Sequence, residues 1–120
     1  MADSHCSSTP IVATLYRRLP DEPEFDKAIY CQAVGSIMYA ALSTRPDLTH
    51  AISLLGRYAC DPSIHHWNAV KRLLRYVKWT IHLQLYLNNW SSNEQSVTIY
   101  ADADFARDCD EAKSTTGLVV

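Results

Sequence analysis

The sequence predicts an α+β fold, with a helical body followed by a small antiparallel sheet. Apolar residues recur at three- and four-residue spacing between residues 26 and 79, in three segments that each have the period of an amphipathic helix. Segments rich in β-formers follow at 97–105 and 115–120. We therefore expect two domains, a helical one over 1–95 and the start of a second, hairpin-containing one over 96–120.

The first helix follows residues 1–25, whose three prolines and lack of periodicity indicate an extended lead-in. It begins near Asp26, and its repeating apolar positions are Tyr30, Val34, Ile37, Met38, Ala41 and Leu42. Gly35 interrupts this pattern, although glycine costs about 1 kcal/mol relative to alanine inside a helix. We therefore expect Gly35 to mark a close contact between helices.

The second helix is predicted to begin at Thr44 as N-cap, with Pro46 in the first turn and Asp47 bonding back to free N–H groups. Arg45 lies at the same helix start, either as a surface residue beside the cap or as a phosphate ligand. The buried stripe of this helix consists of Leu48, Ile52, Leu55 and Ala59.

The third helix carries a basic face. Ser63 is its expected cap, after Asp61 and Pro62 end the second helix. Its apolar face consists of Trp67, Val70, Leu74 and Val77, and Lys71, Arg75 and Lys78 lie on another face at i, i+4 and i+7. Such a basic face either is simply solvated or contacts nucleic acid.

Histidines and cysteines do not predict a metal site. His65 and His66 are adjacent, so on a helix they point in different directions and are better explained as polar residues of the first turn. The four cysteines are widely spread without a C-x-x-C pair, so we expect reduced, partly buried thiols.

The composition is that of a globular protein, with 48% apolar and 20% charged residues. No apolar run approaches the roughly 20 residues of a membrane span, and the polar start MADSHCSSTP does not resemble a secretory signal. We therefore expect an intracellular protein, cytoplasmic or nuclear, without membrane contact. The net charge of -2 combines a basic stretch over 43–90 with an acidic one over 96–120, a distribution that fits either a nucleic-acid path leading to a metal site or two solvated surfaces.

The β-rich part contains the candidate catalytic chemistry. A short strand is expected around Leu83, Leu85 and Leu87, before a polar loop. Asp102 and Asp104 lie two apart in the next strand and so face the same side of it. Grouped carboxylates indicate either a Mg²⁺ site or a solvated strand end, and two of them are too few for two-metal hydrolysis.

Three motifs, read in order, resemble one family. TRPDLTHAISLLGRY, HHWNAVKRLLRYVKWTI and YADADFARDCDEAKSTTGLVV are similar to the copia-type retrotransposon Pol polyprotein, across the end of its reverse transcriptase and the start of its ribonuclease H. YCQAVGSIMYA, which precedes them, matches the same region. Each motif alone is weakly specific, whereas their order and spacing together are highly specific.

The resemblance implies roles for particular residues. It makes 1–95 a C-terminal reverse transcriptase segment, like the thumb and connection, and 96–120 the N-terminal hairpin of a truncated ribonuclease H domain. Asp102 matches a Mg²⁺ ligand of the ribonuclease H site, which would be incomplete here, and Asp104 would lie near it. The helix with Lys71, Arg75 and Lys78 would handle the template-primer, an RNA–DNA hybrid or duplex. Exposed sheet edges would favour self-association.

Departures from the family pattern define the alternatives. Both active sites would be completed by residues beyond this sequence, so we expect no activity from the chain alone. The family usually has glycine at the positions of Trp79, Gln84 and Arg107, and tryptophan at that of Phe105. The alternatives are a remnant module that binds nucleic acid through the basic face, and a decayed copy without function.

Overall fold

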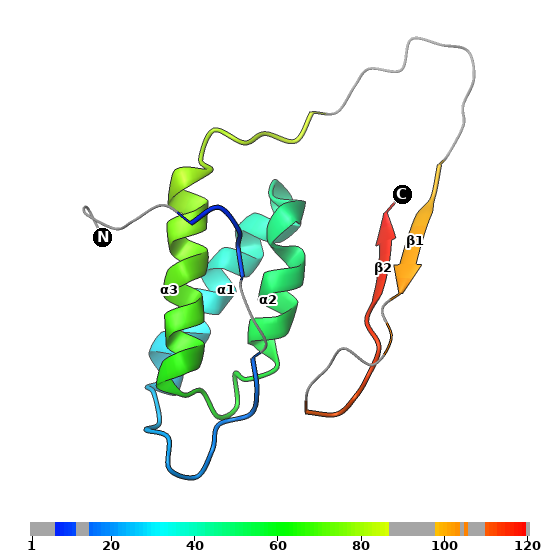
Figure 1. Ribbon diagram of the computed structural model, residues 1–120. Helices are drawn as coiled ribbons and strands as arrows, with labels where there is room; N and C mark the ends of the chain where they lie inside the picture. The colour runs from blue at the N-terminus through cyan, green and yellow to red at the C-terminus, as the bar shows by residue number, and fades with distance from the viewer. Residues whose placement is uncertain (1–6, 12–14, 87–97, 104, 106–109, 120) are drawn as a thin grey trace, which may run out of the picture. The chain divides into compact units, whose positions relative to one another are not determined.

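The computed structural model describes residues 7–11, 15–86, 98–103, 105 and 110–119. Two compact units divide between Leu85 and Tyr86 (Figure 1). The first contains the helices and the second a hairpin, so the predicted mixture of three helices and a two-stranded antiparallel sheet is confirmed. The predicted domain boundary at 95/96 falls outside the described residues.

The elements occur along the chain in the order expected. Their bounds are α1 Lys27–Ser43, the 3₁₀ helix η1 Pro46–Leu48, α2 Thr49–Gly56, α3 Ile64–Trp79, β1 Tyr100–Ala103 and β2 Thr116–Val119. Within the described part of the chain, no helix is long and apolar enough to cross a membrane.

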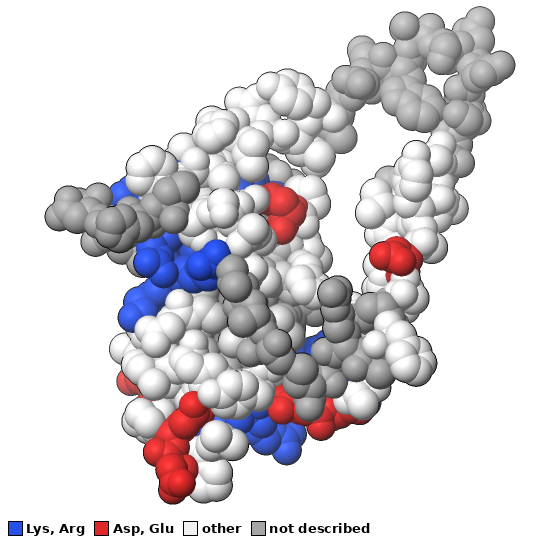
Figure 2. Space-filling model, viewed as in Figure 1, with Lys and Arg blue, Asp and Glu red and all other residues white. Residues whose placement is uncertain are grey.

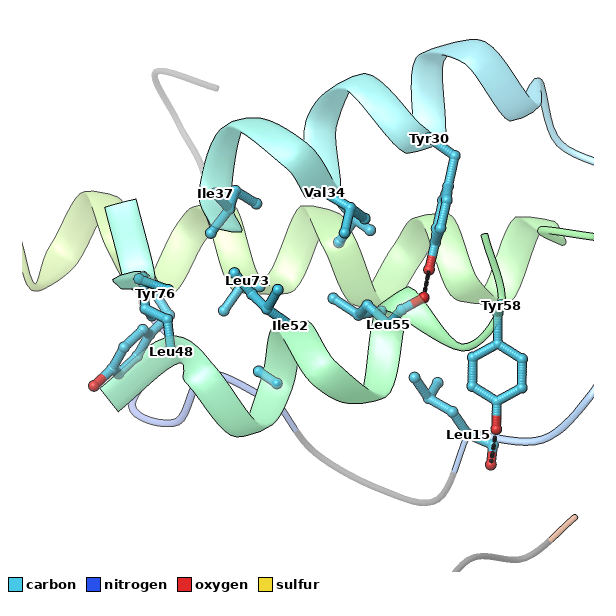
Figure 3. Packing of buried hydrophobic residues seen from close by; sticks show 13 residues of the cluster. Leu15, Tyr30, Val34, Ile37, Leu48, Ile52, Leu55, Tyr58, Leu73 and Tyr76 are labelled. Atoms are coloured by element: carbon cyan, nitrogen blue, oxygen red, sulfur yellow. Dashed lines mark hydrogen bonds between the residues drawn. The ribbon is translucent and has the colours of Figure 1, made fainter. Parts of the chain in front are cut away.

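The core lies where the three α-helices meet. Figure 3 shows Tyr30, Val34 and Ile37 of α1 facing side chains of the other helices. The buried apolar residues are Leu15, Tyr30, Val34, Ile37, Ala41, Leu48, Ala51, Ile52, Leu55, Tyr58, Val70, Leu73 and Tyr76. Two tyrosines also bond across elements, because the hydroxyl of Tyr30 donates to the carbonyl oxygen of Leu55 at 2.8 Å and that of Tyr58 to the carbonyl oxygen of Leu15 at 3.0 Å.

α1 is more exposed than its pattern indicates. Asp26 caps it by accepting a hydrogen bond from the Ile29 N–H at 3.0 Å. Met38 and Leu42, expected in the core, are exposed instead. Gly35 is also exposed, and a Cβ at this position would meet nothing within 4 Å. The prediction of a close helix contact at Gly35 is therefore wrong.

The second helical segment begins differently from the prediction. Thr44 is the C-cap of α1, and its N–H bonds to the carbonyl oxygen of Ala40. Pro46 starts η1, and α2 follows from Thr49. The sequence predicts one long helix because it has no strong breaker between Pro46 and Asp61, whereas the chain forms a short 3₁₀ turn before α2.

The first turn of α3 is capped as predicted, and its buried face is shifted. Ser63 and His66 form a capping box, in which the Ser63 N–H donates to His66 Nδ1 at 2.9 Å. The buried residues of α3 are His66, Val70, Leu73 and Tyr76. Trp67, Leu74 and Val77, which the pattern puts at the centre of the face, lie partly buried at its edge.

The second unit is a two-stranded antiparallel hairpin. Its register pairs Tyr100 with Val119 and Asp102 with Gly117. Every residue of both strands is exposed. The additional strand predicted around Leu83 and Leu85 is absent, since residues 83–86 are described and form no strand, and Leu87 lies outside the described residues.

Candidate nucleic-acid interface

The basic face of α3 consists of Lys71, Arg72, Arg75 and Lys78. These residues lie on the side of the helix away from the buried Val70 and Leu73. Figure 2 shows basic side chains gathered over the middle of this helix. Lys78 is exposed, and the other three are intermediate in exposure because their stems lie along the protein surface. The helix therefore brings together the three residues predicted from the sequence.

This face has little acidic compensation. The segment from Ile64 to Trp79 contains no Asp or Glu. Within the described part of the chain, no carboxylate forms an ion pair with Lys71, Arg72 or Arg75. Positive charge of this kind attracts polyanions, and phosphate backbones above all.

Arg72 is part of the face that sequence reasoning missed. Residues 7–11, drawn in dark blue in Figure 1, run across α3, and Arg72 Nη2 donates to the Thr9 hydroxyl at 2.9 Å. The Nε atoms of Arg72 and Arg75 are buried and make no hydrogen bond. A spacing of i, i+4 and i+7 from Lys71 excludes Arg72, although the three-residue spacing to Arg75 puts it on the same side of the helix.

Arg45 is neither a surface residue nor a phosphate ligand. Only 8% of it is exposed, and its guanidinium donates to both carboxylate oxygens of Asp47, at 2.9 and 2.8 Å. It also donates to the carbonyl oxygen of Thr80 at 3.1 Å and to its hydroxyl at 2.7 Å. All three donor nitrogens are thus used within the fold, which corrects both interpretations of Arg45.

Asp47 completes this network. The hydroxyl of Tyr76 donates to Asp47 Oδ2 at 3.0 Å, so the carboxylate joins η1 to the last turn of α3. The hydrogen bonds from Arg45 are the main cause that lowers the pKa of the Asp47 carboxyl. The network stabilises the helical unit and leaves the basic face of α3 as the candidate for external contact.

The histidines have structural roles, but they do not point in different directions as predicted, because their ring centroids lie 4.0 Å apart. His65 Nδ1 lies 2.7 Å from the Ser63 hydroxyl and 3.2 Å from Glu22 Oε1. A catalytic relay needs the serine and the carboxylate on opposite ring nitrogens, whereas both lie on Nδ1 here. Ser63 is also fully buried, so this serine, histidine and glutamate group has no access to a substrate.

Asp102 lies exposed on β1. Its Oδ1 accepts a hydrogen bond from the Ala103 N–H at 2.9 Å. Asp104, the second predicted carboxylate, is outside the described residues. Across the described ranges, no three His, Cys, Asp or Glu side chains are grouped to hold a metal ion. Mg²⁺ needs several oxygen ligands in octahedral geometry, so the described residues by themselves do not fit a Mg²⁺ site.

The two cysteines within the described residues form no disulfide bond. Cys31 and Cys60 are free and exposed, whereas the sequence predicts partial burial. Cys6 and Cys109 lie outside the described residues.

Comparison with known proteins relates the chain to transposons. The retrovirus-related Pol polyprotein from transposon TNT 1-94 of Nicotiana tabacum is 42% identical over 93 residues, which cover 78% of this chain and 7% of that protein. Secreted RxLR effector protein 161 of Plasmopara viticola is 43% identical over 91 residues, which cover 75% of this chain and 62% of that protein. An uncharacterized mitochondrial protein of Arabidopsis thaliana is 32% identical over 81 residues, 68% of this chain and 70% of that protein.

The chain is thus similar to a short region of the retrovirus-related Pol polyproteins of transposons. It spans only 6–7% of the length of the transposon Pol polyproteins that it matches. No family model matches the chain, and no solved structure matches it.

Two of the positions where the resemblance predicts glycine are compatible with larger residues. Neither Trp79 nor Gln84 has a positive φ, because Ala112 is the one non-glycine residue with positive φ in the described part of the chain. A side chain at these two positions therefore causes no backbone strain. Arg107 lies outside the described residues.

Proposed function

We propose that this chain is the part of a copia-type Pol polyprotein that links reverse transcriptase to ribonuclease H. Its helical unit would correspond to the thumb and connection, and its hairpin to the start of the ribonuclease H domain. The order of the three sequence motifs supports this assignment, together with 42% identity to a transposon Pol polyprotein. In this proposal the basic face of α3 contacts duplex nucleic acid, with an RNA–DNA hybrid as the natural partner.

The observation that carries the binding proposal is the positive charge on α3, where within the described residues no carboxylate pairs with Lys71, Arg72 or Arg75. Lys71 and Lys78 are separated by seven residues, or about 10 Å along the helix axis. A duplex presents one phosphate charge per about 1.7 Å of its axis, so several phosphates lie within reach of this face. Binding would come mainly from the release of counterions and would depend steeply on salt.

Fluorescence anisotropy with a labelled RNA–DNA hybrid, at several salt concentrations, tests the binding proposal. The variant with Lys71→Glu, Arg75→Glu and Lys78→Glu should bind far more weakly, with a salt slope smaller by about one unit for each phosphate that the face no longer neutralises. A control with the same change in net charge is Lys27→Glu, Arg57→Glu and Lys113→Glu, which alters residues outside α3. Equal binding by the two variants would refute the assignment of the face.

The catalytic part of the proposal concerns the complete polyprotein. There Asp102 would be one Mg²⁺ ligand among several carboxylates, and the metal would activate water and stabilise the leaving oxygen. We expect no cleavage of a hybrid by the 120-residue chain with Mg²⁺ present. Cleavage that Asp102→Asn abolishes would overturn this expectation.

A second candidate function is a nucleic-acid-binding module that acts without the polymerase. Similarity over 70% of a much shorter mitochondrial protein favours it, since related segments occur outside full-length Pol polyproteins. This module would use the same basic face, so both candidates predict that this chain binds the hybrid without cleaving it. A decayed copy without function predicts no hybrid binding and no cooperative thermal transition.

A further inference from the structure

Two guanidinium groups on α3 have buried donors without acceptors. Arg72 and Arg75 lie three residues apart, and their Nε atoms are both inaccessible to water and unbonded. Buried N–H donors are nearly always satisfied in proteins, because an unpaired donor loses its hydration without compensation. Two such donors on neighbouring arginines indicate a site that lacks its acceptor.

Residues 7–11, which contact Arg72, supply few acceptors to this pair of arginines. Residues 7–11 read SSTPI and contain no carboxylate. The Thr9 hydroxyl accepts one hydrogen bond, from Arg72 Nη2. The Ser7 hydroxyl instead donates to the carbonyl oxygen of Thr9, within the same segment, at 2.9 Å. The contact of this segment with Arg72 is therefore electrostatically weak.

We propose that Arg72 and Arg75 form an oxyanion site for one phosphate of a nucleic-acid backbone, and that the bound phosphate displaces the Thr9 hydroxyl from Arg72. This inference rests on the proposed nucleic-acid contact of the same face. A phosphate carries negative charge and acceptor oxygens that point in several directions, so it can bond two guanidinium groups at once. A neutral hydroxyl offers one oxygen and no charge.

Thr9 occupies one donor of this site, because its hydroxyl accepts a hydrogen bond from Arg72 Nη2. A phosphate that displaces this hydroxyl gains Arg72 Nη2 as the donor of a charge-assisted hydrogen bond. The hydroxyl of Thr9 and the phosphate therefore compete for Arg72.

Hybrid binding by the full chain tests this competition. Thr9→Val removes the hydroxyl while keeping the shape of the side chain, and it should tighten binding by about threefold or more, because an uncharged acceptor no longer occupies Arg72. Arg72→Gln should weaken binding by about tenfold. In the double variant, Thr9→Val should have no further effect, because its target is gone. Ser8→Ala, an exposed neighbour, should bind like wild type.

A second measurement is independent of nucleic acid. Inorganic phosphate added to the ¹⁵N-labelled wild-type protein should shift the Nε–H resonances of Arg72 and Arg75 more than that of Arg57. Unchanged resonances, or Thr9→Val that binds the hybrid no more tightly than wild type, would overturn the proposed site. If the wild type binds the hybrid and only the triple glutamate variant loses binding, the basic face contacts nucleic acid but the proposed oxyanion site is refuted. If wild type does not bind the hybrid, the proposed function fails as well.

Discussion

Arg45 holds two parts of the helical unit together through one guanidinium. Its partners are Asp47 in η1 and Thr80 just after α3, with Tyr76 bonded to the same carboxylate. The guanidinium carbon also lies 5.8 Å from the centre of the Tyr76 ring, a cation–π distance. Loss of any member leaves a polar group of this network without its partner.

The Asp47 carboxyl makes stability depend on pH. Hydrogen bonds from Arg45 lower its pKa in the folded protein, so the unfolded chain takes up a proton at Asp47 at higher pH than the folded chain does. The stability from this group is fully present above the unfolded value of about 3.9 and is lost as the pH falls through the folded value. Urea unfolding between pH 2 and 7 should therefore show a loss of stability in acid that Asp47→Asn reduces.

A carboxyl outside the network provides the control for this effect. Asp21 is exposed in the lead-in, and Asp21→Asn should leave the acid-dependent loss close to that of wild type. Equal pH profiles for wild type and Asp47→Asn would contradict the proposed role of the Arg45 pair.

Gly35 lowers the free energy of unfolding without serving a contact in this fold. It is exposed in the interior of α1 with a negative φ, and a methyl group at this position would meet nothing within 4 Å beyond the neighbouring residues and backbone of α1 itself. Gly35→Ala should raise the free energy of unfolding by about 0.5–1 kcal/mol, since alanine loses less backbone entropy on helix formation. Thermal and urea unfolding measure the change.

The reverse substitution on the same helix provides the control. Gln32 is also exposed in α1, and Gln32→Gly should lower stability by a similar amount. Destabilisation by Gly35→Ala would mean that this position needs glycine for a contact that the fold of this chain does not contain.

At the scale of elements, His66 decides how α3 is attached to the lead-in. Its Nδ1 accepts the Ser63 N–H, so the proton is on Nε2, which donates to the carbonyl oxygen of Tyr16 at 2.9 Å. The ring is fully buried and stacks on Tyr58 at 4.2 Å between centroids. One side chain thus caps a helix and fixes an irregular segment.

Replacement of His66 separates these two tasks. His66→Ala should destabilise the protein by about 2–4 kcal/mol, because it removes buried contacts and leaves two polar backbone groups unpaired. His66→Gln keeps an acceptor for the Ser63 N–H, so this variant should lose less stability than His66→Ala. Equal losses for the two variants, measured by urea unfolding, would indicate that the capping bond contributes little.

The periodicity of the sequence predicts that the three helices exist, but it does not predict where each helix begins and ends. The three-and-four spacing finds one buried face per helix, because that face must pack whatever the partner is. The prediction of Thr44 as an N-cap is wrong because a threonine shortly before a proline fits either the end of one helix or the start of the next. The bond from its N–H to Ala40 settles the choice, and it forms only because α1 extends to Ser43.

At the scale of the whole molecule, the buried core lies in the helical unit, and the described residues of the hairpin contribute nothing to it. All core residues lie between Leu15 and Tyr76, whereas β1 and β2 are exposed along their full length. A two-stranded hairpin is marginal by itself. Its edges offer unpaired backbone groups, and we propose that they allow self-association of the chain.

A chain that ends at Leu85 should therefore keep most of the stability of the full chain. We expect helical circular dichroism and a cooperative melting transition within a few degrees of the full-length value, because the buried apolar surface is retained. A noncooperative transition in the shortened chain would show that the hairpin region contributes to the core.

The sequence by itself determined the fold class, the three helices, the hairpin and the basic face of α3, because periodicity and charge spacing are local properties of the chain. Tertiary structure decided the rest. Arg45 became a buried link only when α3 placed Thr80 and Tyr76 beside it, and Arg72 met Thr9 across 63 residues of sequence. Such partners meet because segments distant in sequence pack together, and a local sequence pattern carries no information about that packing.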